Sequence, residues 1–118
     1  MIDYVDPIPH IVRFLKIFGV TCYGNTFPLN TKYPSICVKV AGGRGFTRLQ
    51  VTSRSEKDDI EAMNVLINAI NILERHTASI TGLQVEWCER EGNPTPAFDE
   101  AANKCQGWCY MRLEHLEA

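Results

Sequence analysis

Residues 48–76 read RLQVTSRSEKDDIEAMNVLINAINILERH, a strand pattern followed directly by a helix pattern. In the first part Leu49, Val51 and Ser53 alternate with charged or polar residues, which predicts a half-buried strand over 48–54. Ser55 with an acidic residue at 58 has the form of a capping box, so we predict a helix over 56–76. The predicted buried stripe of this helix consists of Ile60, Met63, Leu66, Ile67, Ile70 and Leu73.

On the N-terminal side, a second alternating run at 35–41 precedes the glycine-rich segment 42–45. Two alternating runs joined by such a tip predict a β-hairpin. The segment 28–34 is a turn-rich connector, and 20–27 has the composition of a short strand. The first element is predicted to be a helix over 7–18, capped by Asp6 and ended by Gly19.

On the C-terminal side, a strand is predicted over 82–90, with Leu83, Val85 and Trp87 on one face. Two prolines and a glycine at 91–98 predict a linker without regular structure, and 99–104 is short enough for one helical turn. A closing strand is predicted over 108–115. The element order is therefore α-β-β-β-α-β-β, which indicates an α+β fold with a mainly antiparallel sheet of four to five strands packed against two helices.

Length and composition indicate one globular domain over 1–118. Hydrophobic residues make up 45% and charged residues 22% of the chain, and its formal charge is −2. This charge argues against a general nucleic-acid binder, which carries a basic excess. The chain has neither an apolar run of membrane-spanning length nor a signal-peptide pattern at its start, so we expect no membrane association.

The five cysteines favour free thiols, because their number is odd and no secretion signal accompanies them. A zinc site would have to combine Cys105 and Cys109 with Cys88, His76 or His115, and it lacks the second close pair that such sites show. No histidine lies beside a Ser or Cys in a recognisable nucleophile motif, and the sequence contains neither a nucleophile elbow nor a complete phosphate loop. We therefore expect no catalytic residue, no cofactor and no metal.

Three groups of residues are candidates for contact with a partner. The hairpin carries a group of basic residues, an acidic loop region follows the strand predicted over 82–90, and the first helix has more apolar residues than one buried stripe needs. We expect the basic residues of the hairpin and the acidic loop region to form separate patches. The candidate contact residues are Phe14, Phe18, Arg44, Arg48, Arg54, Glu89, Glu91 and Asp99.

Several segments together resemble a known protein family. They are the helix at 7–18, the run Pro34-Ser35-Ile36-Cys37-Val38, the strand at 48–54 followed at once by the helix, and Gly82-Leu83-Gln84-Val85. In this order they resemble the minor capsid and tail-completion proteins of long-tailed bacteriophages, the tail-terminator or tail-to-head joining class.

The resemblance implies a structural virion protein without catalytic residues, located in the tail or neck and made in the host bacterial cytoplasm. It implies a homo-oligomeric ring, commonly hexameric, that closes the tail tube and contacts the tail-tube and head-connector proteins. DNA passes through such a ring without specific binding. Two alternatives stay open at this point: a small thiol- or metal-dependent enzyme or regulator, and a bacterial protein-interaction module.

Overall fold

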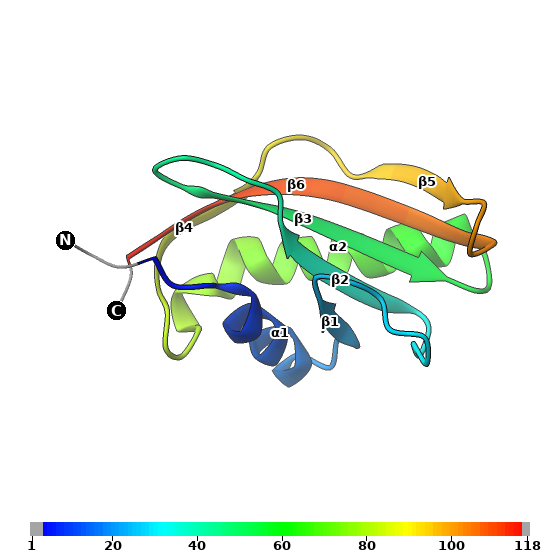
Figure 1. Cartoon of the computed structure of the whole chain (residues 1–118), viewed down its shortest axis with the longest axis horizontal. Coiled ribbons are helices and arrows are strands. Elements are labelled where there is room, and N and C mark those ends of the chain that lie inside the picture. Colours follow the sequence, from blue (N-terminus) through cyan, green and yellow to red (C-terminus); the bar gives the residue numbers. More distant parts are fainter. Residues whose placement is uncertain (1–3, 117–118) are drawn as a thin grey trace.

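The computed structural model describes residues 4–116 and has an α+β fold, as the sequence predicts (Figure 1). Its six strands are one more than the largest number expected. Neither helix in the described residues is long and apolar enough to cross a membrane. The elements in chain order are α1 (Ile8–Ile17), β1 (Cys22–Gly24), β2 (Ser35–Val40), β3 (Thr47–Ser55), α2 (Asp59–His76), a short 3-10 helix (Thr77–Ser79), β4 (Gln84–Arg90), β5 (Thr95–Asp99) and β6 (Lys104–Leu116).

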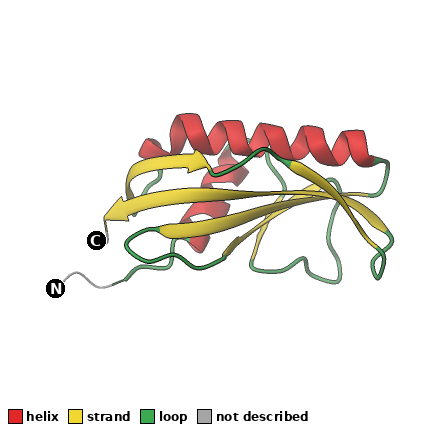
Figure 2. Ribbon diagram, turned by 90° about the horizontal axis from the view of Figure 1, so that it is seen from above, coloured by secondary structure: helices red, strands yellow, loops and turns green. Residues whose placement is uncertain are grey.

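The sheet has the strand order β1-β2-β3-β6-β4, and β5 pairs with the other half of the long strand β6. All of the pairings are antiparallel except β1 with β2. Both helices lie on one side of the sheet (Figure 2). The opposite face of the sheet is therefore not covered by a helix, and β1 and β4 form its two edges.

The core lies between the sheet and the helices. The helix-facing residues of β3 and β6 are fully buried, among them Val51, Met111 and Leu113. Gly107 of β6 lets α2 approach the sheet closely, because a Cβ atom there would lie 2.9 Å from both Leu66 and Met63. The alternation predicted for β3 and for the end of β6 is confirmed.

The predicted linker at 91–98 is wrong in its second half, where Thr95–Asp99 forms β5. This strand pairs with residues 104–108, so β6 begins at Lys104 instead of residue 108. An edge strand tolerates the proline at 96, because its missing N–H removes no bond from the sheet when it faces outward. The predicted helical turn over 99–104 is instead the tight reversal between β5 and β6, with Asn103 in the left-handed region at φ 54°.

The face predicted for Trp87 is also wrong. The register of β4 against β6 shifts between Val85 and Trp87, which is the mark of a β-bulge. Beyond the bulge, Cys88 is buried and the Trp87 side chain is 54% exposed. One inserted residue is enough to exchange the two faces of a strand, since side chains alternate with a period of two.

Two details of α2 differ from the prediction. Its N-cap is Asp58 instead of Ser55, and the Asp58 carboxylate accepts a hydrogen bond from the Glu61 N–H at 2.8 Å. Ile60 and Ile67, predicted to be buried, are exposed. The buried stripe instead includes Ala62 and Ala69, whose small side chains allow close contact between the helix and the sheet.

The first helix agrees more closely with its prediction. It spans Ile8–Ile17 inside the expected 7–18, and the Asp6 carboxylate accepts a hydrogen bond from the Ile8 N–H at 3.0 Å. Gly19 follows it with φ 81°, a conformation that favours glycine. The strand expected at 20–27 is limited to Cys22–Gly24.

Candidate functional site

The uncovered face of the sheet is the largest surface that the fold leaves free of helices. It carries the residues of β3 and β6 that alternate with the buried ones, among them Arg48, Arg54, Tyr110 and Arg112. We call this surface the open face. Two of the candidate contact residues, Arg48 and Arg54, lie on it.

Ion pairs join the arginines of the open face to nearby carboxylates. Arg48 contacts Glu91 at 3.0 Å, and Arg54 contacts Asp99 at 2.6 Å. The basic and acidic residues predicted to form separate patches are therefore paired with each other across the sheet. Their charges largely cancel, which leaves little net positive charge on this face from these side chains.

Aromatic rings hold the arginine side chains in place. The Arg54 guanidinium lies 4.5 Å from the centre of the Phe27 ring, and that of Arg112 lies 3.9 Å from the centre of the Phe46 ring. Stacking of this kind favours arginine over lysine, because the guanidinium is planar. The open face thus presents ordered side chains instead of freely moving charges.

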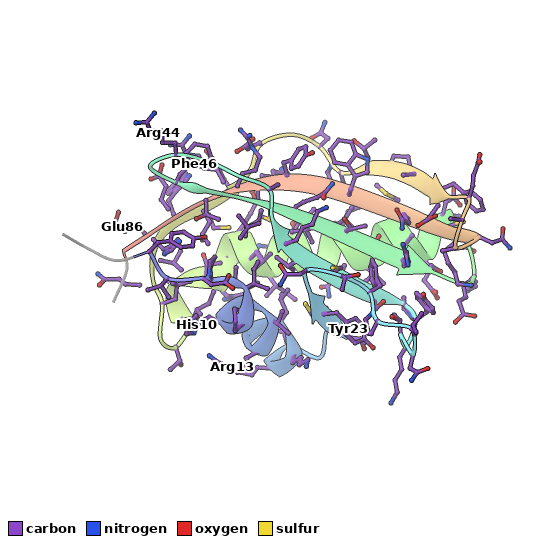
Figure 3. The ribbon with its side chains drawn as sticks, viewed as in Figure 1. His10, Arg13, Tyr23, Arg44, Phe46 and Glu86 are labelled. Carbon is purple, nitrogen blue, oxygen red and sulfur yellow. The ribbon has the colours of Figure 1, made fainter. Side chains whose placement is uncertain are left out.

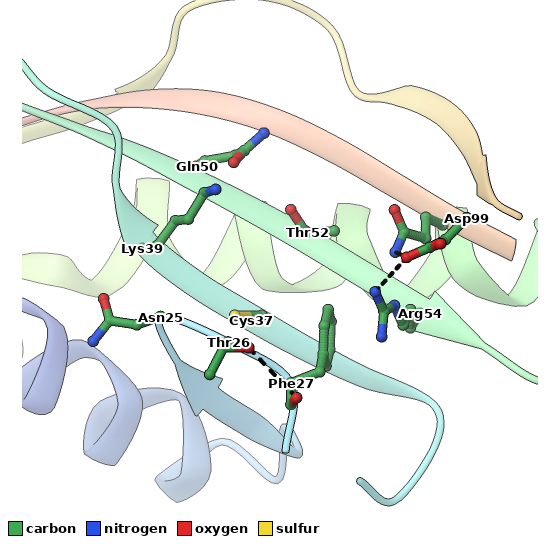
Figure 4. Close-up of a pocket in the computed structure, with 10 residues that line it drawn as sticks. Asn25, Thr26, Phe27, Cys37, Lys39, Gln50, Thr52, Arg54 and Asp99 are labelled. Atoms are coloured by element: carbon green, nitrogen blue, oxygen red, sulfur yellow. Dashed lines mark hydrogen bonds and ion pairs between the residues drawn. The ribbon is translucent and has the colours of Figure 1, made fainter. Parts of the chain in front are cut away.

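A shallow groove of about 350 Å³ runs over the open face between the β1–β2 connector and β5 (Figure 4). Arg54 and Asp99 form one end of it, and Lys39 and Gln50 lie toward the other. Its cation and amide groups suit hydrogen bonding to an anionic or amide-bearing group of a partner. The Cys37 thiol also lines the groove, and burial raises its pKa.

The remaining predicted contact residues are distributed over several places. Arg44 is exposed at the tip of the β2–β3 loop (Figure 3). Glu89 is exposed on β4, opposite Arg112 in the register. Phe18 is 43% exposed and its ring stacks on His76 at 5.1 Å. Phe14 is a core residue with only 6% exposure, so it does not belong to the surface.

Ile17 and Phe98 are exposed apolar residues that were not among the predicted contact residues. Ile17, the last residue of α1, is 82% exposed, and Phe98 of β5 is 53% exposed. Ile17 was assigned only to a generally apolar helix, and Phe98 to a linker. Helical spacing could have indicated that Ile17 is exposed, because Ile17 follows Arg13 by one helical turn and lies on the same side of the helix.

The five cysteines are free thiols in the structure. Burial, as the largest cause, raises the pKa of Cys22 and of Cys88 to about 12, and it also raises the pKa of Cys109. Thiols are activated as nucleophiles by a lowered pKa, so these three buried thiols have the opposite property.

Cys105 and Cys109, the pair considered for zinc, are both on the extended strand β6. Four residues of strand separate their Cα atoms by about 13 Å, too far for two thiolates to share one metal ion. Within residues 4–116, no group of three or more His, Cys, Asp or Glu side chains is placed to hold a metal ion.

Each histidine contacts a partner other than cysteine. His10 accepts a hydrogen bond from Arg13, His115 lies 3.3 Å from the Thr47 hydroxyl, and His76 stacks on Phe18. No protein-family model matches this chain, and no curated protein matches it in sequence.

Proposed function

We propose that this chain is a structural protein of a long-tailed phage or prophage. In this proposal it forms a ring, commonly hexameric in the family it resembles, that terminates the tail tube and joins it to the head connector. The α+β fold agrees with the resemblance, and its element order, α-β-β-β-α-β-β-β, adds only β5 to the order on which the resemblance rests.

The observation that carries the proposal is the exposure of large apolar side chains on two unlike surfaces. One is the end of α1, with Ile17 at 82% and Phe18 at 43% exposure. The other is the outer side of β4, where Trp87 is 54% exposed. A closed ring needs such a pair of different patches, because each subunit contacts its neighbours head to tail.

The paired charges of the open face fit a protein through which DNA passes without being held. A protein that neutralises phosphates with lysine and arginine gains affinity from the release of counterions. Here Arg48, Arg54 and Arg112 already have carboxylate partners. Together with the net charge of −2, this pairing supports weak attraction to DNA.

Sedimentation velocity tests the proposal on the full chain at micromolar concentration, alone and with the tail-tube protein encoded beside it. We expect a discrete oligomer in at least one of the two samples, and genes for portal, tail-tube and tape-measure proteins nearby. A chain that stays monomeric in both samples, in a neighbourhood without such genes, contradicts the proposal.

A further inference from the structure

The two edges of the sheet carry grooves of opposite charge. At the β1 edge a groove of about 420 Å³ is lined by Lys16 and Lys32 and by no carboxylate. At the β4 edge a groove of about 400 Å³ is lined by three carboxylates, with one arginine among them. The charged residues of this second groove are Glu74, Arg75, Glu86 and Glu89. We call the two surfaces the basic edge and the acidic edge.

The edge charges differ from the open-face arginines in having no ion-pair partner in the part of the chain that the structure describes. The three ion pairs found there all involve open-face arginines, and none includes Lys16, Lys32, Glu86 or Glu89. Each edge groove therefore has an excess of one sign of charge that no intramolecular ion pair cancels.

Local contacts fix both grooves to the sheet. At the basic edge, the Lys32 N–H donates a hydrogen bond to the Tyr23 hydroxyl at 3.1 Å, which ties the connector to β1. At the acidic edge, the Glu74 carboxylate accepts a hydrogen bond from the Arg90 N–H at 3.1 Å. Burial raises the pKa of Cys88, and the charges of Glu74 and Glu89 raise it further, in agreement with carboxylates close to this strand.

Each groove is also lined by an aromatic residue and lies beside a strand with a free side. Tyr23 lines the basic groove, and Trp87, which is 54% exposed, lines the acidic groove. Within residues 4–116 no strand pairs with the outer side of β1 or of β4. An uncovered strand edge is a template for another chain. Charge, apolar area and strand edge thus coincide on both sides of the molecule, and Figure 3 shows Tyr23 and Glu86 well apart on these two strands.

We propose that the occupant of each groove is a second copy of this chain, with the basic edge of one copy seated on the acidic edge of the next. This inference rests on the proposed function and names the surfaces through which the ring closes. The two edges lie four strand spacings apart, about 19 Å, so one copy cannot satisfy both by itself. Each copy uses each edge once, which is the arrangement of a head-to-tail ring.

Zero-length crosslinking with a carbodiimide tests the contact directly. A mixture of ¹⁴N-labelled and ¹⁵N-labelled full chains is assembled, treated and digested. We expect mixed-isotope peptides that join Lys16 or Lys32 to Glu86 or Glu89. Assembly without any of these links, but with links between other residues, overturns the inference and leaves the ring proposal intact.

Charge reversal gives an independent test that uses sedimentation velocity. The double variant Lys16→Glu/Lys32→Glu makes both edges acidic, and Glu86→Lys/Glu89→Lys makes both edges basic. We therefore expect each variant alone to need at least a tenfold higher protein concentration than the wild type in order to assemble. An equimolar mixture should assemble again, because alternating copies restore opposite charges at every contact.

The control is Lys57→Glu, which reverses an exposed charge outside both grooves and should assemble as the wild type does. If both double variants assemble as the wild type does, the edge contact is overturned but the ring proposal is not. A wild type that never assembles overturns the ring as well. Where a reversed variant fails to fold, as judged by its thermal transition, the crosslinks of the wild type decide.

Discussion

Arg54 and Asp99 form the ion pair of the open face whose arginine is least exposed. Their side chains are 18% and 27% exposed, against 38% and 28% for Arg48 and Glu91. Arg54 also stacks on Phe27, so less freedom is lost on pairing. We expect a double-mutant cycle with Arg54→Met and Asp99→Asn to give a coupling energy of about 1 kcal/mol.

The matched cycle with Arg48→Met and Glu91→Gln should give only about 0.3 kcal/mol, because that arginine is more accessible to water. Urea unfolding of the single and double variants measures both coupling energies. Asp99→Asn keeps the oxygen that accepts the Ala102 N–H, so the turn before β6 is retained. Equal coupling in the two cycles would show that the difference in exposure has no energetic effect.

Cys22 makes the stability of the protein sensitive to alkaline pH. Burial raises the pKa of its thiol from 9.0 to about 12 in the folded chain. Between these values the unfolded thiol ionises while the folded one keeps its proton, so unfolding releases a proton. The stabilisation is complete below pH 9 and is lost as the pH rises toward 12, at up to about 1.4 kcal/mol per pH unit.

We therefore expect the free energy of unfolding of Cys22→Ala to fall less steeply than that of the wild type between pH 8.5 and pH 10.5. Urea unfolding at several pH values in this range measures the slope. Val20→Ala is the control, because it removes a buried side chain of the same region that does not titrate. It should lower stability and keep the wild-type slope. A Cys22→Ala slope as steep as that of the wild type contradicts the prediction.

The start of α2 depends on one carboxylate, that of Asp58, which accepts the Glu61 N–H. Asp58→Ala leaves this donor without its partner and should lower the free energy of unfolding by about 1 kcal/mol, while Asp58→Ser should retain most of it. Asp59→Ala is the matched control, because Asp59 lies inside the first turn and makes no capping bond. Thermal and urea unfolding measure the stability of the three variants. An equal loss of stability in Asp58→Ala and Asp59→Ala would mean that the effect comes from the removed charge and not from the capping hydrogen bond.

The sequence predicted those elements best whose two sides differ in polarity. In β3 the alternation of Leu49 and Val51 with arginine, glutamine and threonine follows the burial pattern residue by residue. β5 was missed because Pro94 and Pro96 mark a loop, and only pairing with β6 stabilises an extended conformation there. The bulge before Trp87 has no local signal, since it is a property of the register between β4 and β6.

The candidate surfaces were predictable only in part, because they also depend on contacts between segments that are far apart in the sequence. Arg48 and Glu91 are 43 residues apart in the chain, and the pairing of β3, β6 and β4 brings them together. The residue types therefore indicated a positive charge on the hairpin and a negative charge in the loop, but not that the two charges pair. Phe14 and Ile17 belong to one apolar helix, and tertiary packing alone decides that the first is buried and the second is exposed.

In the folded molecule the net charge of −2 has an ordered distribution. In the described residues the three arginines of the open face have carboxylate partners, whereas the charges in the grooves beside β1 and β4 form no ion pair. Exposed pairs between subunits are screened by salt, with a Debye length of about 8 Å at physiological ionic strength. If the copies assemble through the proposed edges, we expect assembly to weaken at high salt, and the exposed apolar residues to contribute the part that salt does not remove.

Substitution of Ile17 tests how much exposed apolar side chains contribute to assembly. Ile17 is 82% exposed at the end of α1, so Ile17→Ser costs the monomer little stability but removes apolar area from the end of α1, one of the two apolar surfaces on which the ring proposal rests. We expect assembly to require a several-fold higher protein concentration, with the thermal transition of the monomer unchanged. Ile67→Ser is the control, because Ile67 is also an exposed helical isoleucine but lies on the middle of α2, outside the end of α1. Sedimentation velocity over a range of concentrations compares the two variants. Equal weakening by both substitutions would mean that the end of α1 is no specific contact, and an Ile17→Ser protein that assembles as the wild type does would remove this surface from the interface.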